Sequence, residues 1–125
     1  MDITPIIPAE RQVIQAYGDG HFRISGVVHE GSVIVLPERT LAWAATALAE
    51  LTIESLEGVL AAEPRVELLL VGCGREPGPI AADLRAALRA RGIVVEVMDT
   101  GAACRTFNVL LAEGRRVAAA LIAVA

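Results

Sequence analysis

The chain has 125 residues, a length typical of one domain, and 54% of them are hydrophobic, which is enough for a sizeable core. Its formal net charge is −4, so it lacks the basic surface that neutralises nucleic-acid phosphates. Only 3% of the residues are aromatic, so it also lacks rings on which unpaired bases stack. We therefore expect a single domain over residues 1–125 that does not bind nucleic acid.

No apolar stretch reaches the roughly 18 uncharged residues that a membrane span needs. The opening "MDITPIIPAERQ" has no basic region followed by an apolar run, so it does not resemble a targeting segment. The cysteines, Cys73 and Cys104, and the histidines, His21 and His29, show no metal-binding spacing and no disulfide framework. We expect a cytoplasmic protein with reduced thiols, no metal and no cofactor.

Residues 12–36 carry short alternating or β-branched runs, "QVIQAY", "HFRI", "GVVH" and "SVIVL", which are separated by glycine-containing turns. This pattern predicts an antiparallel β-meander. In the next segment, "TLAWAATALAEL" is rich enough in alanine for a helix, but its period is unclear and it is also compatible with an extended segment. "TIESLEGVLAAEP" predicts a helix that Thr52 caps and Pro64 ends.

The C-terminal half alternates strands with helices. Residues 66–71 form a continuous apolar run, typical of a strand covered on both faces. A helix follows, with Pro79 in its first turn and Gly92 at its end, and then a strand over residues 93–99. Thr100 caps a second helix that Gly114 ends, and "RRVAAALIAV" supplies the last strand. We predict a parallel βαβαβ unit, and hence an α/β domain with an N-terminal meander.

Polar and glycine residues follow two of the predicted parallel strands, at the edge where open α/β sheets bind ligands. The candidate ligand-binding residues are Gly72, Cys73, Gly74, Asp99, Thr100, Cys104, Arg105, Thr106 and Asn108. Arg105 could hold an anion beside a helix N-terminus, whose dipole would also lower the pKa of the Cys104 thiol. The same residues also fit purely structural roles as a turn, a cap, a first-turn charge and an amide bonded to a neighbouring loop.

The glycine turn does not match a known nucleotide-binding motif. A dinucleotide fingerprint needs glycine or alanine where this chain has Pro77, and no P-loop is present. No base, nucleophile and orienting group can be recognised together, and no carboxylate pair has the spacing for acid–base work, so we assign no catalytic residues.

The chain resembles the small Mth-type domain family, a former domain of unknown function that includes a mitochondrial complex I assembly factor and an adipogenesis-associated protein. The resemblance is carried by "FRISG", "GSVIVLP", Trp43, "LTIESLE", "ELLLVGCG", "RARGIVVEVMDT" and "AACRTFNVLLAEGRRVAAALI". It implies a compact three-layer Mth-like α/β fold with a mixed central sheet and a smaller antiparallel sheet, in which residues 41–47 are extended.

The resemblance implies no catalytic activity, cofactor or substrate, and it points to assembly factors that bind other proteins. The chain departs from the family where Cys73 replaces a usual threonine and Phe107 a frequent tyrosine. Both changes favour packing over chemistry. Our leading hypothesis is a non-enzymatic protein-binding or assembly-factor-like domain, and the alternative is a small-molecule or anion site at the residues above. Self-association through an edge of the meander is a further hypothesis.

Overall fold

The computed structural model describes residues 11–75 and 77–125, and the opening segment up to residue 10 lies outside the described part. The strands are β1 (Ile14–Gly18), β2 (His21–Ile24), β3 (Val27–Glu30), β4 (Val33–Val35), β5 (Thr40–Ala42), β6 (Leu68–Gly72), β7 (Val94–Met98) and β8 (Val117–Leu121). The helices are α1 (Glu57–Leu60), α2 (Ala82–Ala90) and α3 (Thr100–Ala112), with short 3-10 turns η1 (Leu48–Glu50) and η2 (Glu54–Leu56).

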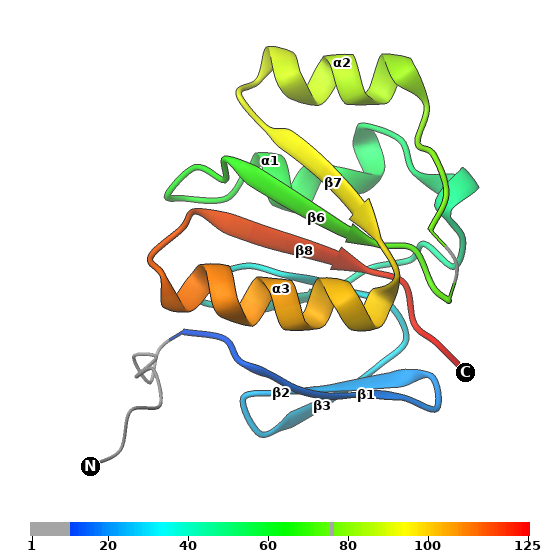
Figure 1. Cartoon of the computed structure of the whole chain (residues 1–125), viewed down its shortest axis with the longest axis vertical. Coiled ribbons are helices and arrows are strands. Elements are labelled where there is room, and N and C mark those ends of the chain that lie inside the picture. Colours follow the sequence, from blue (N-terminus) through cyan, green and yellow to red (C-terminus); the bar gives the residue numbers. More distant parts are fainter. Residues whose placement is uncertain (1–10, 76) are drawn as a thin grey trace.

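A mixed five-stranded sheet forms the centre of the molecule, in the order β5-β4-β8-β6-β7 (Figure 1). β6 runs parallel to both β7 and β8, with Leu70 opposite Glu96 on one side and Ala119 on the other. β4 runs antiparallel to β8 and to β5. The predicted parallel βαβαβ half is therefore confirmed, and it forms the β8-β6-β7 side of the sheet.

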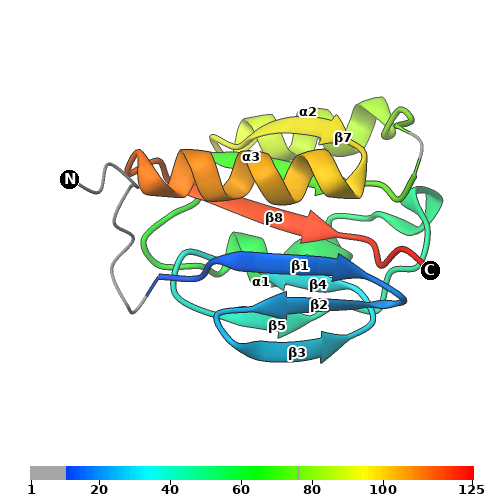
Figure 2. The same ribbon diagram turned by 60° about the horizontal axis from the view of Figure 1, so that its bottom comes forward.

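The smaller sheet consists of β1, β2 and β3 in antiparallel order (Figure 2). The meander is confirmed for these three strands. It is wrong for the fourth run, because β4 leaves the small sheet and pairs with β8 in the central one. The physical reason is that Val33, Ile34 and Val35 are all buried, so this continuous apolar run suits a strand covered on both faces rather than one exposed on alternate residues.

Two apolar clusters lie on opposite faces of the central sheet. One cluster includes Leu56, Leu84 and Leu88 from the α1 and α2 side. The other includes Phe107 of α3 and Phe22 of β2, so α3 and the small sheet cover the second face together. These layers give the three-layer α/β architecture that the family resemblance implied.

Three local predictions need correction or completion. Residues 40–42 form β5, so the extended interpretation is right there, while residues 48–50 form a 3-10 turn. The helix expected over residues 52–63 is shorter, since it starts as η2 and ends at Leu60. Thr52 Oγ1 does accept from the Ser55 N–H at 3.1 Å, as a cap would. Pro79 lies before α2 rather than in its first turn, because α2 begins at Ala82.

Candidate functional site

The two turns singled out from the sequence meet in the fold and are joined by hydrogen bonds. The Gly74 N–H donates to Thr100 Oγ1 at 2.9 Å, and the Thr100 N–H donates to the Gly74 carbonyl at 2.8 Å. The Thr100 hydroxyl donates in turn to the Ile122 carbonyl at 2.8 Å, and its side chain is fully buried. Thr100 therefore joins the ends of β6, β8 and α3.

The N-cap of α3 is Asp99, and the prediction that Thr100 caps this helix is wrong. The Asp99 backbone is extended, and its carboxylate accepts from the Ala102 N–H at 2.9 Å. A carboxylate at this position satisfies an amide of the first turn and interacts favourably with the helix dipole. Thr100 cannot take this role because its hydroxyl is committed to Gly74 and Ile122.

Gly72 permits close packing at the end of β6. A Cβ atom at this position would lie 2.9 Å from Leu121 Cδ2 and 3.0 Å from the Thr100 Cα atom. The second contact is with helix backbone, which cannot rotate away. Gly74 differs, since it has open space around it but a φ of +95°, a conformation that glycine adopts without strain. Each glycine of the "GCG" turn thus has a structural reason of its own.

The thiol of Cys104 is not activated by the helix dipole. Burial raises its pKa to about 12, while Arg105 lowers the pKa and Asp99 raises it further. The expectation of a lowered pKa is therefore wrong, because desolvation of the thiolate outweighs the dipole. Cys73 is half-buried, and its Sγ donates to the Met98 carbonyl at 3.2 Å, next to the backbone bond between the Cys73 N–H and the same carbonyl.

The remaining candidates diverge along α3. Arg105 is exposed, and its Nη1 would lie 3.3 Å from a Cβ placed on Gly101. Thr106 is half-buried. Asn108 lies away from the glycine turn and binds β1, since its Oδ1 accepts from the Ile14 N–H at 3.0 Å and its Nδ2 donates to the Ile14 carbonyl at 2.8 Å. Asn108 therefore has the structural role of an amide that bonds backbone, but its partner is the strand β1 and not the neighbouring loop that was expected.

A hollow of about 460 Å³ does lie at this edge of the sheet. Its lining residues are Tyr17, Gly18, Gly74, Arg75, Asp99, Gly101, Val124 and Ala125. Sequence reasoning missed Tyr17, whose phenol lies against Gly101 so closely that a Cβ there would contact it. The signal available in the sequence was Gly101 itself, a glycine in the first turn of a helix.

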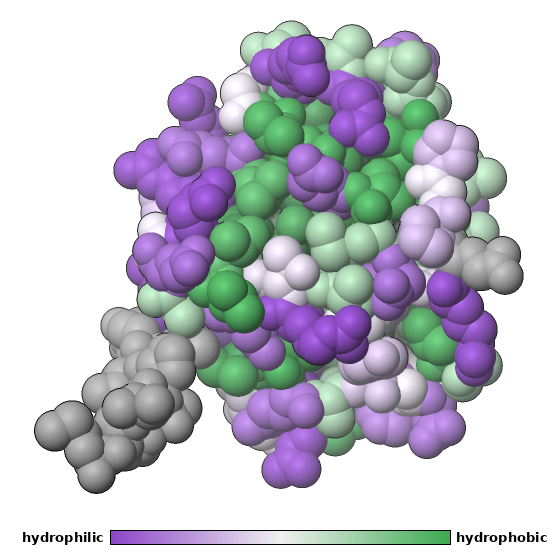
Figure 3. Space-filling view, viewed as in Figure 1, coloured by the Kyte–Doolittle hydropathy of each residue, from purple (hydrophilic) through white to green (hydrophobic). Residues whose placement is uncertain are grey.

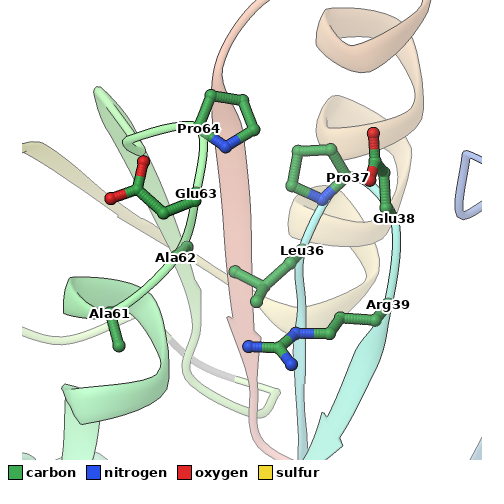
Figure 4. A pocket seen from close by; sticks show the side chains of 8 residues that line it. All are labelled: Leu36, Pro37, Glu38, Arg39, Ala61, Ala62, Glu63 and Pro64. Atoms are coloured by element: carbon green, nitrogen blue, oxygen red, sulfur yellow. The ribbon is translucent and has the colours of Figure 1, made fainter.

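Gly72, Thr100 and Cys104 are buried and do not line this hollow. Asp99 does line it, so a carboxylate already stands at the N-terminus of α3. A second hollow, of about 330 Å³, lies between the β4–β5 turn and the segment after α1, and it contains none of the predicted residues (Figure 4). It is lined by Leu36, Pro37, Glu38, Arg39, Ala61, Ala62, Glu63 and Pro64.

Within residues 11–75 and 77–125, no three histidine, cysteine or acidic side chains come close enough together to hold a metal ion. In the same residues, no helix has both the length and the apolar character to cross a membrane.

The fold and the edge just described define a small α/β domain of the Mth938-like class. The chain is similar to a Bordetella pertussis protein described as a Mth938-like domain, with a TM-score of 0.79 and 32% identity, covering 98% of this chain and 92% of that one. Residues 14–122 match the family described as protein of unknown function DUF498/DUF598, and the chain belongs to this family.

Two further relatives give the breadth of the similarity. A crystal structure described as an outer membrane protein from Bartonella henselae has a TM-score of 0.85 at 42% identity and covers 94% of this chain and 98% of that one. NADH dehydrogenase [ubiquinone] 1 alpha subcomplex assembly factor 3 of Danio rerio is 40% identical over 110 residues. These are 88% of this chain but 63% of that protein, so the chain spans less than two thirds of its assembly-factor relative.

Proposed function

We propose that this chain is a non-enzymatic, protein-binding domain that acts as an assembly factor for a larger protein complex. The observation that carries the proposal is the 40% identity to a protein named as an NADH dehydrogenase assembly factor. By this proposal the partners are subunits of a complex of that kind. The cytoplasmic location expected from the sequence stays a prediction.

The geometry of the candidate site supports binding by another surface. Three of the candidate residues are buried and contact only other parts of the chain: Gly72 and Cys104 pack against neighbouring residues, and Thr100 forms internal hydrogen bonds. Burial also raises the pKa of the Cys104 thiol, which leaves it a poor nucleophile. The presence of these three residues is thus explained by the packing of α3 against the parallel strands, without a catalytic role.

A small-anion site in the hollow beside Tyr17 and Gly101 is the weaker proposal. The N-terminus of a helix attracts anions, but Asp99 already places its own carboxylate there and accepts from the Ala102 N–H. A second negative group would face that carboxylate, and like charges at short distance repel. Arg75 lines the hollow but is exposed and donates from Nη2 to the Ala125 carbonyl at 2.8 Å, and Arg105 is exposed outside the lining, so the counter-charge is modest.

The proposal is tested in the host by deleting the gene and measuring the amount of assembled NADH dehydrogenase in membranes. We expect the deletion to reduce the assembled complex, and we expect the full-length chain to restore it. The Cys73→Ala variant, which removes the half-buried thiol of the site, should restore it equally. An unchanged level of the complex in the deletion strain would contradict the assembly role. If the wild-type chain restores the complex but the Cys73→Ala variant does not, a chemical role for the Cys73 thiol would be favoured.

A further inference from the structure

β7 is an edge strand of the central sheet, and within residues 11–75 and 77–125 no strand pairs with its outer side. The Val94 N–H donates to the Glu67 carbonyl, and the Met98 carbonyl accepts from the Cys73 N–H, so these residues face inward. Residues of a parallel strand alternate in the direction of their backbone groups. The N–H and C=O groups of Val95 and Val97 therefore point outward, away from β6.

One of these outward groups has a side-chain partner. Arg85 of α2 reaches over the edge and donates from Nη1 to the Val95 carbonyl at 2.8 Å. This bond is independent support for the direction of the Val95 backbone. Natural proteins often protect open edges with charged side chains, and Arg85 protects this edge at a single carbonyl.

Exposed apolar side chains lie on β7 and on α3, the helix that contacts β7. The side chain of Val94 is 53% exposed, and that of Val109 on α3 is 57% exposed. Figure 3 shows apolar surface across this face of the molecule, where β7 lies between α2 and α3. Glu96 is exposed between Val94 and Met98 on the strand. An incoming strand would thus meet apolar contacts on both sides of one acidic position.

The beginning of β7 borders an arginine-rich hollow of about 550 Å³. Its lining residues are Arg65, Glu67, Leu68, Gly92, Val94, Glu96, Arg115 and Arg116. Arg116 lies 3.5 Å from Glu67, and among the described residues this is the one ion pair, so Arg65 and Arg115 have no carboxylate partner there. This hollow is therefore suited to acidic groups, although the whole chain has a net charge of −4.

We propose that the open edge of β7 binds an extended segment of a partner protein, which adds to the central sheet as an antiparallel strand. This proposal rests on the proposed protein-binding function and names its surface. An antiparallel segment places its C-terminal end at the beginning of β7, so that end carries acidic residues that face Arg65 and Arg115. Apolar side chains cover Val94 and Val109, and a basic residue faces Glu96.

A second copy of this chain fits the edge less well. The symmetric antiparallel pairing that matches Val95 with Val97 of the other copy is centred on Glu96. It places the two Glu96 carboxylates opposite each other, and like charges in directly opposed positions destabilise a strand pair. A register centred on Val95 avoids this repulsion but sets each Glu96 carboxylate against an exposed Val94 side chain. A partner segment can instead place a basic residue opposite Glu96, which is why we choose a partner segment over self-pairing.

The test uses the full chain and a synthetic peptide. The peptide alternates valine with threonine, carries one lysine in its middle and ends in two aspartates. Amide hydrogen exchange followed by NMR reports on single edge positions. We expect saturable protection of the Val95 and Val97 amides by at least about tenfold, with the amides of β3, an edge of the small sheet, unchanged. Absence of protection at Val95 and Val97 up to millimolar peptide would overturn the proposal.

A matched peptide separates strand pairing from side-chain attraction. It has the same side chains but carries N-methyl groups on the residues that would donate to the β7 carbonyls. Because N-methylation removes the donors, this peptide should lose the protection. Equal binding of both peptides would overturn pairing along β7. Protection that grows with protein concentration and without peptide would mean that a second copy occupies the edge, and would also overturn the proposal.

Substitutions test the charges and the protecting arginine. Exposed Arg65 and Arg115, replaced together by glutamate, should weaken binding of the acidic peptide at least about tenfold and restore it for a peptide ending in two lysines. Arg85→Ala frees the Val95 carbonyl and should tighten binding several-fold, whereas Arg89→Ala on the same helix should leave it unchanged. Equal effects of the last two variants would refute the protecting role of Arg85.

The peptide experiment and the gene deletion test the docking site and the assembly role separately. If the deletion strain lacks assembled complex but the peptide leaves Val95 and Val97 unprotected, the protein is an assembly factor that binds through another surface. If the peptide binds at β7 but the complex assembles normally without the chain, the docking site stands and the assembly role fails.

Discussion

Thr100 and Gly74 are joined by two hydrogen bonds: the Gly74 N–H donates to Thr100 Oγ1 at 2.9 Å, and the Thr100 N–H donates to the Gly74 carbonyl at 2.8 Å. These bonds fix the loop after β6 against the first residue of α3. Together with the bond from the Thr100 hydroxyl to Ile122, they close the carboxyl edge of β6 and β8. At the edge where many α/β sheets hold a ligand, the chain's own polar groups thus bond to one another, and the hollow beside Tyr17 lies next to them.

Replacement of Thr100 by valine should destabilise the fold by about 2 kcal/mol or more. Valine keeps the shape but leaves the Gly74 N–H and the Ile122 carbonyl without their partner, and each such group costs about 1–3 kcal/mol when it is buried. Urea unfolding followed by Trp43 fluorescence measures the difference. Thr100→Ser, which keeps the hydroxyl, should lose less. A valine variant as stable as the wild type would show that these bonds contribute nothing.

The parallel half of the sheet could be predicted because strands that are buried on both faces have continuous apolar sequences, which a short window of sequence shows. The continuous apolar runs before Gly72 and after Arg116 are buried almost throughout, as their composition suggested. The division of residues 12–36 between two sheets is less evident from the sequence. In the sequence, β3 and β4 are separated by a short glycine-containing segment like those within the meander, and only the continuous apolar run Val33 through Val35 distinguishes β4.

The sequence predicted that the glycine turn and the start of α3 lie together, as the bonds between Gly74 and Thr100 show, but the role of each residue could not be read from the sequence. Asp99 and Thr100 are neighbours that both occur at helix starts, and the choice between them depends on where Gly74 and Ile122 lie. Tyr17 reaches Gly101 from a strand 84 positions away in the chain, so no local pattern shows the contact. Tertiary partners, absent from any short window, decide these roles.

The two glycines of the "GCG" turn should respond differently to alanine. Gly72→Ala places a Cβ against the Thr100 Cα atom and the Leu121 side chain, so we expect a loss of about 1–3 kcal/mol from overpacking. Gly74→Ala meets no neighbouring atom but must adopt a φ of +95°, so we expect a loss of about 1–2 kcal/mol from backbone strain alone.

Structures of the two alanine variants distinguish these causes better than stability alone. The Gly72 variant should shift α3 away from β6, whereas the Gly74 variant should change only the turn itself. An unshifted α3 in the Gly72 variant would contradict the packing explanation. If so, the requirement for glycine at that position would have to come from something that binds there.

Asn108 should be the main polar attachment between α3 and the small sheet. Asn108→Asp keeps the size of the side chain but cannot donate to the Ile14 carbonyl, so we expect a loss of about 1–2 kcal/mol. Hydrogen exchange should be faster in β1 and β2, while β6 stays protected, because the change loosens the small sheet first. Equal acceleration in both sheets would show that Asn108 stabilises the molecule as one unit.

Cys104 should make stability fall at alkaline pH. Its pKa is about 12 in the folded chain against an ordinary value of 9.0, so above pH 9 the unfolded chain loses a proton that the folded chain keeps. Stability from this group is complete below pH 9 and falls by up to about 1.4 kcal/mol per pH unit between the two values. Urea unfolding from pH 8 to 10.5 measures the slope. Few other side chains titrate in this pH range, because the chain has no lysine, one tyrosine and one other cysteine. The control variant Cys104→Ala, which removes the titrating thiol, should flatten the slope. An equal slope in both proteins would contradict the assignment to Cys104.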